Sequence, residues 1–262
     1  CKSTGYILDN FYKKILREFL KICKNRPEAI EKYDQGFIDP LGIVKRVEFI
    51  HERGDIYREI VVLGDDDLIS IACSLTRLPK RVVVLEIDER IVNFINNIAR
   101  KYKLNLEAHI FDAQEKLPKK FEKSFDVFIT DPVETVPGLK LFFSRVVAAL
   151  RGIGSAGYFG ITQLEASRKK WLEIENMIYK MGFVITDIRR AFNIYPDIEG
   201  NMFRFEEKFP LFKKIKIKSD FDWYNSSFFR IEAVKKPKPL IKKEMKINEK
   251  IYKDDESLAT PI

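Results

Sequence analysis

Short apolar runs alternate with longer amphipathic stretches along most of the chain. The runs have the length of strands and lie at residues 60–63, 82–85, 108–111, 127–130, 158–161 and 184–187. Between them, apolar positions recur at helical spacing over residues 68–76, 89–101, 139–150 and 167–181. Buried strands that alternate with amphipathic helices are typical of a mostly parallel sheet with helices on both faces. The pattern therefore predicts an α/β fold.

The two ends of the chain differ from this central pattern. Helical patterns at 9–24 and 41–53 precede the first strand, and runs at 215–218 and 228–231 could add antiparallel strands near the C-terminus. We expect three parts, namely a helical cap at 1–55, a Rossmann-like catalytic domain at 56–234 and a flexible basic tail at 235–262. The tail holds eight Lys and five acidic residues, and a solvated terminus without a role fits it equally well.

Composition excludes several classes of protein. With 262 residues, of which 45% are hydrophobic, the chain is long and apolar enough for a folded core. Its apolar runs are too short for a membrane helix, and its first residues do not resemble a signal peptide. Three widely spaced cysteines do not make a disulfide scaffold and favour a reducing, cytoplasmic location. The net charge of +8 is compatible with nucleic-acid binding but does not decide the function.

Carboxylates follow each of the first four predicted strands. They are Asp65, Asp66 and Asp67 after the first strand, Glu86 and Asp88 after the second, Asp112 after the third, and Asp131 and Glu134 after the fourth. In a parallel α/β sheet, ligands bind outside the carboxyl ends of the strands. A solvated loop explains any one of these residues, but the whole set predicts an acidic ligand site in a basic protein.

The loop after the first strand has an unusual composition for a nucleotide site. A single glycine, Gly64, precedes three aspartates, whereas a phosphate-binding loop needs several glycines and attracts anions. Three neighbouring carboxylates repel phosphate and attract a polycation, although one of them can also cap the following helix. The sequence therefore excludes a phosphate-binding loop here.

The next two strand ends suit an adenosine group. Glu86 lies where an acidic side chain takes the hydroxyls of a ribose, with Asp88 beside it. Asp112 can accept from the exocyclic amine of adenine, and the backbone of Ala113 can bond a ring nitrogen. A surface charge at Glu86 and a simple turn at Asp112 are the alternatives. Together with the acidic first loop, these residues indicate an adenosine-containing co-substrate that carries positive charge.

At these residues the sequence resembles the branched-chain polyamine synthases of thermophilic archaea and bacteria. The resemblance covers almost the whole body of the chain and is carried by residues 33–37, 62–68, 131–136, 156–162 and 223–231. The Gly-Asp-Asp-Asp and Asp-Pro-x-Glu-Thr motifs are its most specific part. Val133 stands where the family usually has a second proline. We expect the family's N-terminal winged-helix-like domain to be absent here, and we interpret residues 1–5 as the remnant of a connector.

The resemblance implies a class I methyltransferase-type fold, a homodimer and an aminopropyltransferase activity. The donor is decarboxylated S-adenosylmethionine, and the acceptor is the central secondary amine, N4, of spermidine. One transfer gives N4-aminopropylspermidine and a second gives N4-bis(aminopropyl)spermidine, each with release of methylthioadenosine. Physical reasoning agrees, because an acidic loop repels the carboxylate of ordinary S-adenosylmethionine and attracts the cationic decarboxylated donor. No metal or prosthetic group is expected, since the sulfonium is already a good leaving group.

The resemblance also implies roles for individual residues. Asp66 is the candidate base for the acceptor amine, Asp65 grips the amine of the donor, and Asp131 occupies the place of a catalytic aspartate. The expected polyamine contacts are Asp67, Glu134, Tyr33, Asp34, Gln35, Tyr158, Trp223 and Tyr224. For the aromatic residues, a place in the core is the alternative; for residues 33–35, it is a simple loop between two helices.

Two other classes of function compete with this interpretation. A methyltransferase acting on nucleic acid fits the Asp-Pro dipeptide at 131–132, but such enzymes stack the flipped base on an aromatic residue where this chain has Glu134. A non-enzymatic nucleic-acid-binding module could use the Lys-rich tail for phosphate contacts. That second alternative leaves the acidic strand ends unexplained, so we expect nucleic acid not to be the partner.

Overall fold

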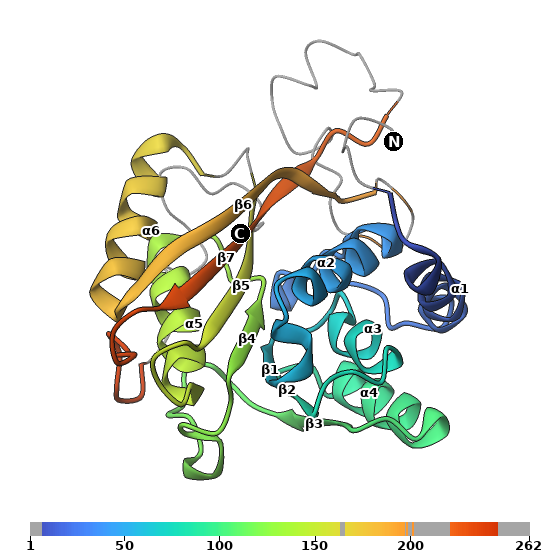
Figure 1. The fold of residues 1–262 in the computed structure, drawn as a ribbon, viewed down its shortest axis with the longest axis horizontal. Coiled ribbons are helices and arrows are strands. Elements are labelled where there is room, and N and C mark those ends of the chain that lie inside the picture. The colour runs from blue at the N-terminus through green and yellow to red at the C-terminus, as the bar shows by residue number, and fades with distance from the viewer. Residues whose placement is uncertain (1–6, 163–165, 197, 199–200, 202–220, 246–262) are drawn as a thin grey trace.

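One mixed sheet forms the centre of the protein in the computed structural model (Figure 1). The structure describes residues 7–162, 166–196, 198, 201 and 221–245. The strands are β1 (Glu59–Leu63), β2 (Arg81–Glu86), β3 (Leu106–Ile110), β4 (Val127–Thr130), β5 (Ala156–Thr162), β6 (Phe183–Ile194) and β7 (Asn225–Ala233). Their order in the sheet is β3-β2-β1-β4-β5-β7-β6. The first five strands are parallel, and β7 lies antiparallel between β5 and β6.

Helices cover both faces of this sheet, as the sequence predicts. They are α1 (Asn10–Cys23), α2 (Pro40–Glu52), α3 (Ile69–Leu75), α4 (Glu89–Tyr102), α5 (Val136–Ala149) and α6 (Arg168–Met181). Helices α1 to α4 share one apolar cluster with the sheet, while α5 and α6 share a second cluster on the other face. None of the described helices is long and apolar enough to span a membrane.

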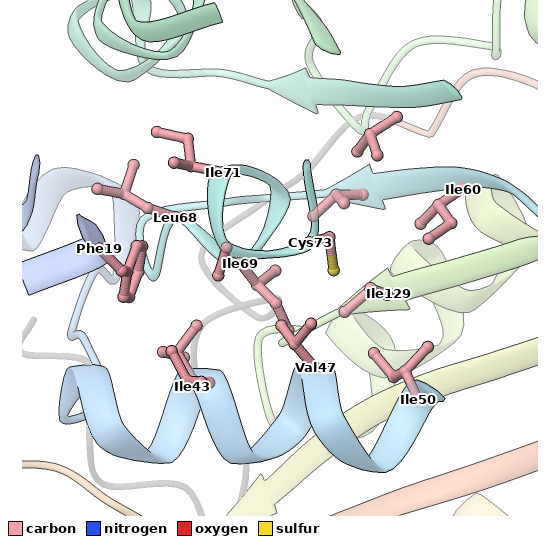
Figure 2. Close-up of a cluster of buried hydrophobic side chains, with 14 of the residues drawn as sticks. Phe19, Ile43, Val47, Ile50, Ile60, Leu68, Ile69, Ile71, Cys73 and Ile129 are labelled. Atoms are coloured by element: carbon pink, nitrogen blue, oxygen red, sulfur yellow. The ribbon is translucent and has the colours of Figure 1, made fainter. Parts of the chain in front are cut away.

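The strands are buried on both faces, which explains their continuous apolar runs. Along β1, Ile60 and Val62 point into the cluster of α1 to α4, and Val61 and Leu63 point into the other cluster. Each side chain of this kind contributes about 1.5–3 kcal/mol when it is fully buried. Figure 2 shows the first cluster, where side chains of α2 meet α3, β1 and β4. The N-terminal helices are therefore part of the same core as the sheet.

The ends of the chain correct one expectation and leave others open. Residues 235–245 are not a loose tail, because backbone hydrogen bonds hold them to the end of α6 and to Gln114. Residue Arg145 of α5 adds two further bonds to this segment. The expected strand at 215–218 and the rest of the tail lie outside the described residues. The proposed boundaries at residues 55 and 234 stay predictions.

Candidate active site

A cavity of about 120 Å³ lies at the carboxyl ends of β1 to β4. Most of the predicted site residues line it, namely Tyr33, Asp34, Gln35, Gly64, Asp66, Glu86, Asp112, Ala113 and Asp131. Phe142, from α5, is a further lining residue. The members of this set that follow β1 to β4 meet here because parallel strands bring the loops that follow them to one edge of the sheet.

The aspartates that follow Gly64 take different directions. The carboxylate of Asp66 lines the cavity, and its Oδ2 atom accepts a hydrogen bond from the backbone N–H of Gly36 at 2.9 Å. Asp65 turns into the protein, where it is 1% exposed and accepts from the backbone N–H of Ser70 at 3.4 Å. Among the aspartates of this loop, Asp66 is thus the one that can meet a ligand directly.

Asp67 is also buried and holds the segment that covers the site. Its Oδ1 atom accepts from the backbone N–H of Ile38 at 2.6 Å, and its Oδ2 atom lies 3.9 Å from the guanidinium of Arg46. Burial, followed by the neighbouring charges of Asp66 and Asp131, raises the pKa of Asp67. The expected direct contact of Asp65 and Asp67 with substrate is therefore not seen, because the loop points both carboxylates away from the cavity.

The electrostatic surroundings of Asp66 suit proton transfer. Burial, and then the charge of Glu86, raise the pKa of Asp66 to about 7. The guanidinium of Arg26 lowers the pKa only in part, and it donates its hydrogen bond to the backbone carbonyl of Asp66, at 3.4 Å. A general base works best when its pKa lies near the operating pH. Asp66 therefore has the environment of a base at neutral pH.

Asp131 has a different partner, which the sequence did not reveal. The buried side chain of Arg46, on α2, donates from both terminal nitrogens to the Asp131 carboxylate, with Nη2 at 3.2 Å from Oδ1. The Nε atom of Arg46 donates to Asn193 at 2.8 Å. The backbone N–H of Gly160 donates to Asp131 at 2.8 Å, and a Cβ at Gly160 would collide with this carboxylate. These bonds fix the position of the Asp131 carboxyl group at the wall of the cavity.

The ends of β2 and β3 carry the two carboxylates predicted for the nucleoside. Glu86 accepts from the backbone N–H groups of Asp65 at 2.7 Å and Asp88 at 2.9 Å. Asp112 accepts from the backbone and side-chain nitrogens of Gln114, at 2.8 and 3.0 Å. Both carboxylates are thereby fixed in place, and each keeps lone pairs for hydroxyl or amine donors of a ligand.

The segment at 33–36 closes the cavity on a third side. Gln35 donates to Asp88 at 3.0 Å and accepts from the backbone N–H of Ile30 at 3.0 Å. Asp88 itself caps α4 through the backbone N–H of Arg90 and is nearly fully buried. Asp88 was expected to bind the co-substrate, but its side chain does not line the cavity. It ties the covering segment to the end of β2.

Tyr158 and Glu134 are predicted substrate contacts that the structure does not bring to the cavity. Tyr158 is fully buried, and its hydroxyl donates at 2.6 Å to Asp55, which precedes β1 at the opposite end of the strand. Tyr158 is thus a core residue, because its strand turns this side chain toward α2. Glu134 accepts from the backbone and hydroxyl of Thr162 at 2.8 and 2.6 Å, which joins the loop after β4 to the end of β5.

Aromatic residues lie beside the acidic wall. Tyr224 is buried, and its ring lies 5.2 Å from that of Tyr195. Burial, followed by the charges of Asp131 and Asp67, raises the pKa of Tyr195. Trp223, half-buried, packs against the core of α1 to α4. Tyr195 carries no signal in the sequence that marks it, and the predicted contacts Trp223 and Tyr224 do not line the cavity.

The described residues contain no group of three or more His, Cys, Asp or Glu side chains that could hold a metal ion. Cys73 is fully buried in the apolar cluster of α3, as Figure 2 shows, and Cys23 is half-buried. Burial raises the pKa of Cys23 to about 11. The cavity is lined by carboxylates, amides, aromatic rings and aliphatic side chains such as Leu63 and Leu85.

Comparison with known proteins identifies the family. The profile described as "Branched-chain polyamine synthase A C-terminal domain" matches residues 14–259. This chain belongs to the branched-chain polyamine synthase family. The N(4)-bis(aminopropyl)spermidine synthase of Methanocaldococcus jannaschii is 42% identical over 99% of this chain and 74% of its own length. The enzyme of that name from Thermococcus kodakarensis is 40% identical, with the same coverage.

Solved structures agree on the fold and show ligands in a family member. The branched-chain polyamine synthase C9 mutein from Thermus thermophilus, in complex with N4-aminopropylspermidine and 5'-methylthioadenosine, superposes with a TM-score of 0.89 at 37% identity. The superposition covers 100% of this chain and 74% of the Thermus thermophilus chain. A putative RNA methyltransferase from Pyrococcus horikoshii superposes with a TM-score of 0.60 at 15% identity. The branched-chain polyamine synthases thus have the class I methyltransferase-like fold expected from the sequence.

Proposed function

We propose that this chain transfers aminopropyl groups from decarboxylated S-adenosylmethionine to the N4 amine of spermidine. The products are N4-aminopropylspermidine, then N4-bis(aminopropyl)spermidine, with one methylthioadenosine released in each transfer. The observation that carries this proposal is Asp66, whose carboxyl group has a pKa of about 7. It lines the same cavity as Glu86, Asp112 and Asp131. The matching relatives are named for the same product.

Asp66 performs the proton transfer in this proposal. A secondary ammonium, with a pKa near the ~10.4 of a lysine model amine, has no lone pair free for attack at neutral pH. Asp66 accepts the proton, and the freed electron pair attacks the carbon that is bonded to the sulfonium. The C–S bond breaks, and its electron pair stays on sulfur as neutral methylthioadenosine leaves. The new tertiary ammonium then loses its remaining N–H proton before a second transfer, which gives a quaternary nitrogen with no proton to lose.

The remaining carboxylates hold positive charge and the nucleoside. Asp131, fixed by Arg46, faces an ammonium of the polyamine or the amine of the donor. Glu86 binds the ribose hydroxyls, and Asp112 with Ala113 binds the adenine edge. Residues 33–35 cover the bound substrates. We assign Asp65 and Asp67 to shaping this loop rather than to substrate contact, because both are buried away from the cavity.

Positioning and charge supply most of the catalysis in this scheme. Holding the amine and the sulfonium carbon in line makes the attack effectively intramolecular, and the carboxylates favour cations in the site before and during the reaction. A homodimer and a cytoplasmic location remain part of the proposal.

The mass of the product tests this function. The protein is incubated with spermidine and decarboxylated S-adenosylmethionine, and in parallel with spermidine or RNA and ordinary S-adenosylmethionine. We expect mass gains of one and then two aminopropyl groups on spermidine with the first donor only. Methylation of spermidine or RNA with the second donor would contradict the proposal and support the methyltransferase alternative.

A further inference from the structure

Arg145 is a buried arginine outside the cavity whose described partners are all uncharged. It lies on α5 and is 2% exposed. None of the described acidic side chains forms a salt bridge with it, whereas the buried Arg46 is paired with Asp131. A buried guanidinium is expensive unless its N–H groups are satisfied, so the acceptors of Arg145 indicate its purpose.

One side of Arg145 holds the loop expected to bind adenine. Its Nε atom donates to the carbonyl of Ala113 at 2.7 Å, and its Nη2 atom donates to the carbonyl of Gln114 at 3.2 Å. Ala113 and Gln114 line the cavity, as does Phe142 on the same helix one turn before Arg145. The guanidinium therefore grips this loop from behind while Phe142 forms part of the cavity wall.

The other side of Arg145 holds the segment at 240–245, which we call the strap. Arg145 donates to the carbonyls of Ile241 at 3.3 Å and Lys243 at 3.0 Å. The backbone N–H of Met245 in turn donates to the carbonyl of Gln114 at 2.9 Å. The strap also packs on the core of α5 and α6 through Leu240, Ile241 and Met245. Loop, strap and α5 thus meet at one guanidinium.

We infer that Arg145 is a positioning residue for the donor nucleoside, which it serves by fixing the loop at 111–114 against α5 and the strap. The inference rests on the proposed function for the identity of the nucleoside. It follows from geometry, since four carbonyls converge on a planar group with five donors, and a lysine cannot replace a planar fork of this kind. Without the hydrogen bonds from Arg145, the loop at 111–114 no longer has a fixed position relative to the cavity.

The test compares the wild type with Arg145→Met and Arg145→Lys in the full chain. We expect the dissociation constant of methylthioadenosine, measured by calorimetry, to rise about tenfold to a hundredfold in Arg145→Met, since a misplacement of 1 Å can cost ~10²-fold. Arg145→Lys should recover only part of this loss. The KM for the donor should rise more than kcat falls, and the affinity for N4-aminopropylspermidine should change less than about twofold by the additivity of separate sites.

Hydrogen exchange in the ligand-free protein provides a second readout that does not depend on the identity of the substrate. Amides of residues 111–114 should exchange faster in Arg145→Met, while those of the loop at 64–67 remain as in the wild type. Arg151→Met is the matched control, because Arg151 pairs with Glu59 and Asp126 at the opposite end of β1 and β4. This control should change neither exchange at 111–114 nor nucleoside binding.

Two results would overturn the inference. One is unchanged exchange at 111–114 in Arg145→Met. The other is an equal loss of affinity for methylthioadenosine and N4-aminopropylspermidine, which would indicate general destabilisation. If the wild-type protein bound no methylthioadenosine, the proposed function would fail, and the exchange experiment would still decide whether Arg145 fixes the loop.

Discussion

Buried carboxylates occur at both ends of the parallel strands, but only one end pairs them fully. At the amino end, Asp55 accepts from Tyr158 at 2.6 Å, from Arg230 at 2.8 Å and from Arg58 at 3.3 Å. Arg230 is bonded further to Thr186 at 2.8 Å. At this end, the protein itself supplies the positive charges and the hydrogen-bond donors that the Asp55 carboxylate needs.

The carboxyl end contrasts with this arrangement. Five carboxylates gather there, namely Asp65, Asp66, Asp67, Glu86 and Asp131. The buried side chain of Arg46 forms ion pairs with Asp131 and Asp67. In the described part of the chain, no Lys or Arg forms a salt bridge with Asp66 or Glu86. Burial raises the pKa of both carboxyls, and the pKa of Asp66 reaches about 7.

The difference separates a structural carboxylate from a functional one. Where the protein supplies the counter-charge, the carboxylate stabilises the fold, and its replacement by a neutral side chain lowers the free energy of unfolding. Where the protein supplies no counter-charge, the neighbouring carboxylates repel one another, and a cationic ligand lowers the free energy of the site. A donor with a sulfonium and an amine, and an acceptor with three amines, would supply the missing charge.

Asp66→Asn should abolish aminopropyl transfer, with kcat lower by ~10²- to 10⁴-fold, because an amide cannot act as the base. The amide oxygen can still accept from Gly36, so the circular dichroism spectrum should match that of the wild type. Steady-state release of methylthioadenosine measures the effect. Turnover close to the wild-type rate would move the role of base to Asp131. Asp55→Asn is the matched control, and it should keep its turnover per folded molecule.

Asp55→Asn should instead lower the free energy of unfolding, by about 3–5 kcal/mol, because it removes the buried counter-charge of Arg230. Among the described residues, Arg230 then keeps only its ion pair with the more exposed Glu232, at 3.0 Å. Denaturant titration at pH 7 measures this change. A loss below ~1 kcal/mol, the usual value for an exposed ion pair, would show that the amino-end network is not the matched structural site described above.

The pH dependence of kcat/KM should show a limb near pH 7, with a fall of about tenfold per pH unit on the acidic side, because protonated Asp66 cannot accept a proton. Glu86→Gln should move this limb to lower pH, since the charge of Glu86 helps to raise the pKa of Asp66. The same limb in Glu86→Gln and in the wild type would show that the two carboxylates are not coupled.

Asp66→Asn should also affect stability with the opposite sign from Asp55→Asn. The pKa of Asp66 is raised in the folded state, so the folded protein binds more protons than the unfolded chain between pH ~4 and ~7. Wild-type stability therefore falls as the pH rises through that window, and the variant does not share this loss. Unfolding curves at pH 5 and pH 8 should show that the advantage of the variant grows with pH; a constant difference would contradict the assignment.

Much of the fold could be predicted from the sequence because its strands are buried on both faces. Continuous apolar runs mark such strands, and the helices between them show a clear stripe. The strand-end rule then brought Asp66, Glu86, Asp112 and Asp131 to one cavity. This much of the site depends on topology alone.

Other features of the site depend on side-chain direction, which the pattern does not specify. Arg46 belongs to a helical stretch where a charged residue normally faces solvent, yet it is fully buried. Every residue of β5 is buried, so the sequence does not indicate that the hydroxyl of Tyr158 bonds Asp55, before β1, and does not reach the cavity. The strap is held by backbone carbonyls, which all residues possess and no sequence pattern reveals.

Decarboxylated and ordinary S-adenosylmethionine differ by one carboxylate, so a comparison of the two donors shows whether the acidic site selects for positive charge. A second carboxylate ~4 Å away costs about 4 kcal/mol at an effective dielectric of 20. After screening by water, a few kcal/mol remain, which corresponds to at least ~100-fold in affinity. Competition against methylthioadenosine should therefore show a preference of that size for the decarboxylated donor, and Asp66→Asn should reduce it. Equal affinity of the wild-type protein for both donors would contradict the account of an acidic site that lacks its counter-charge.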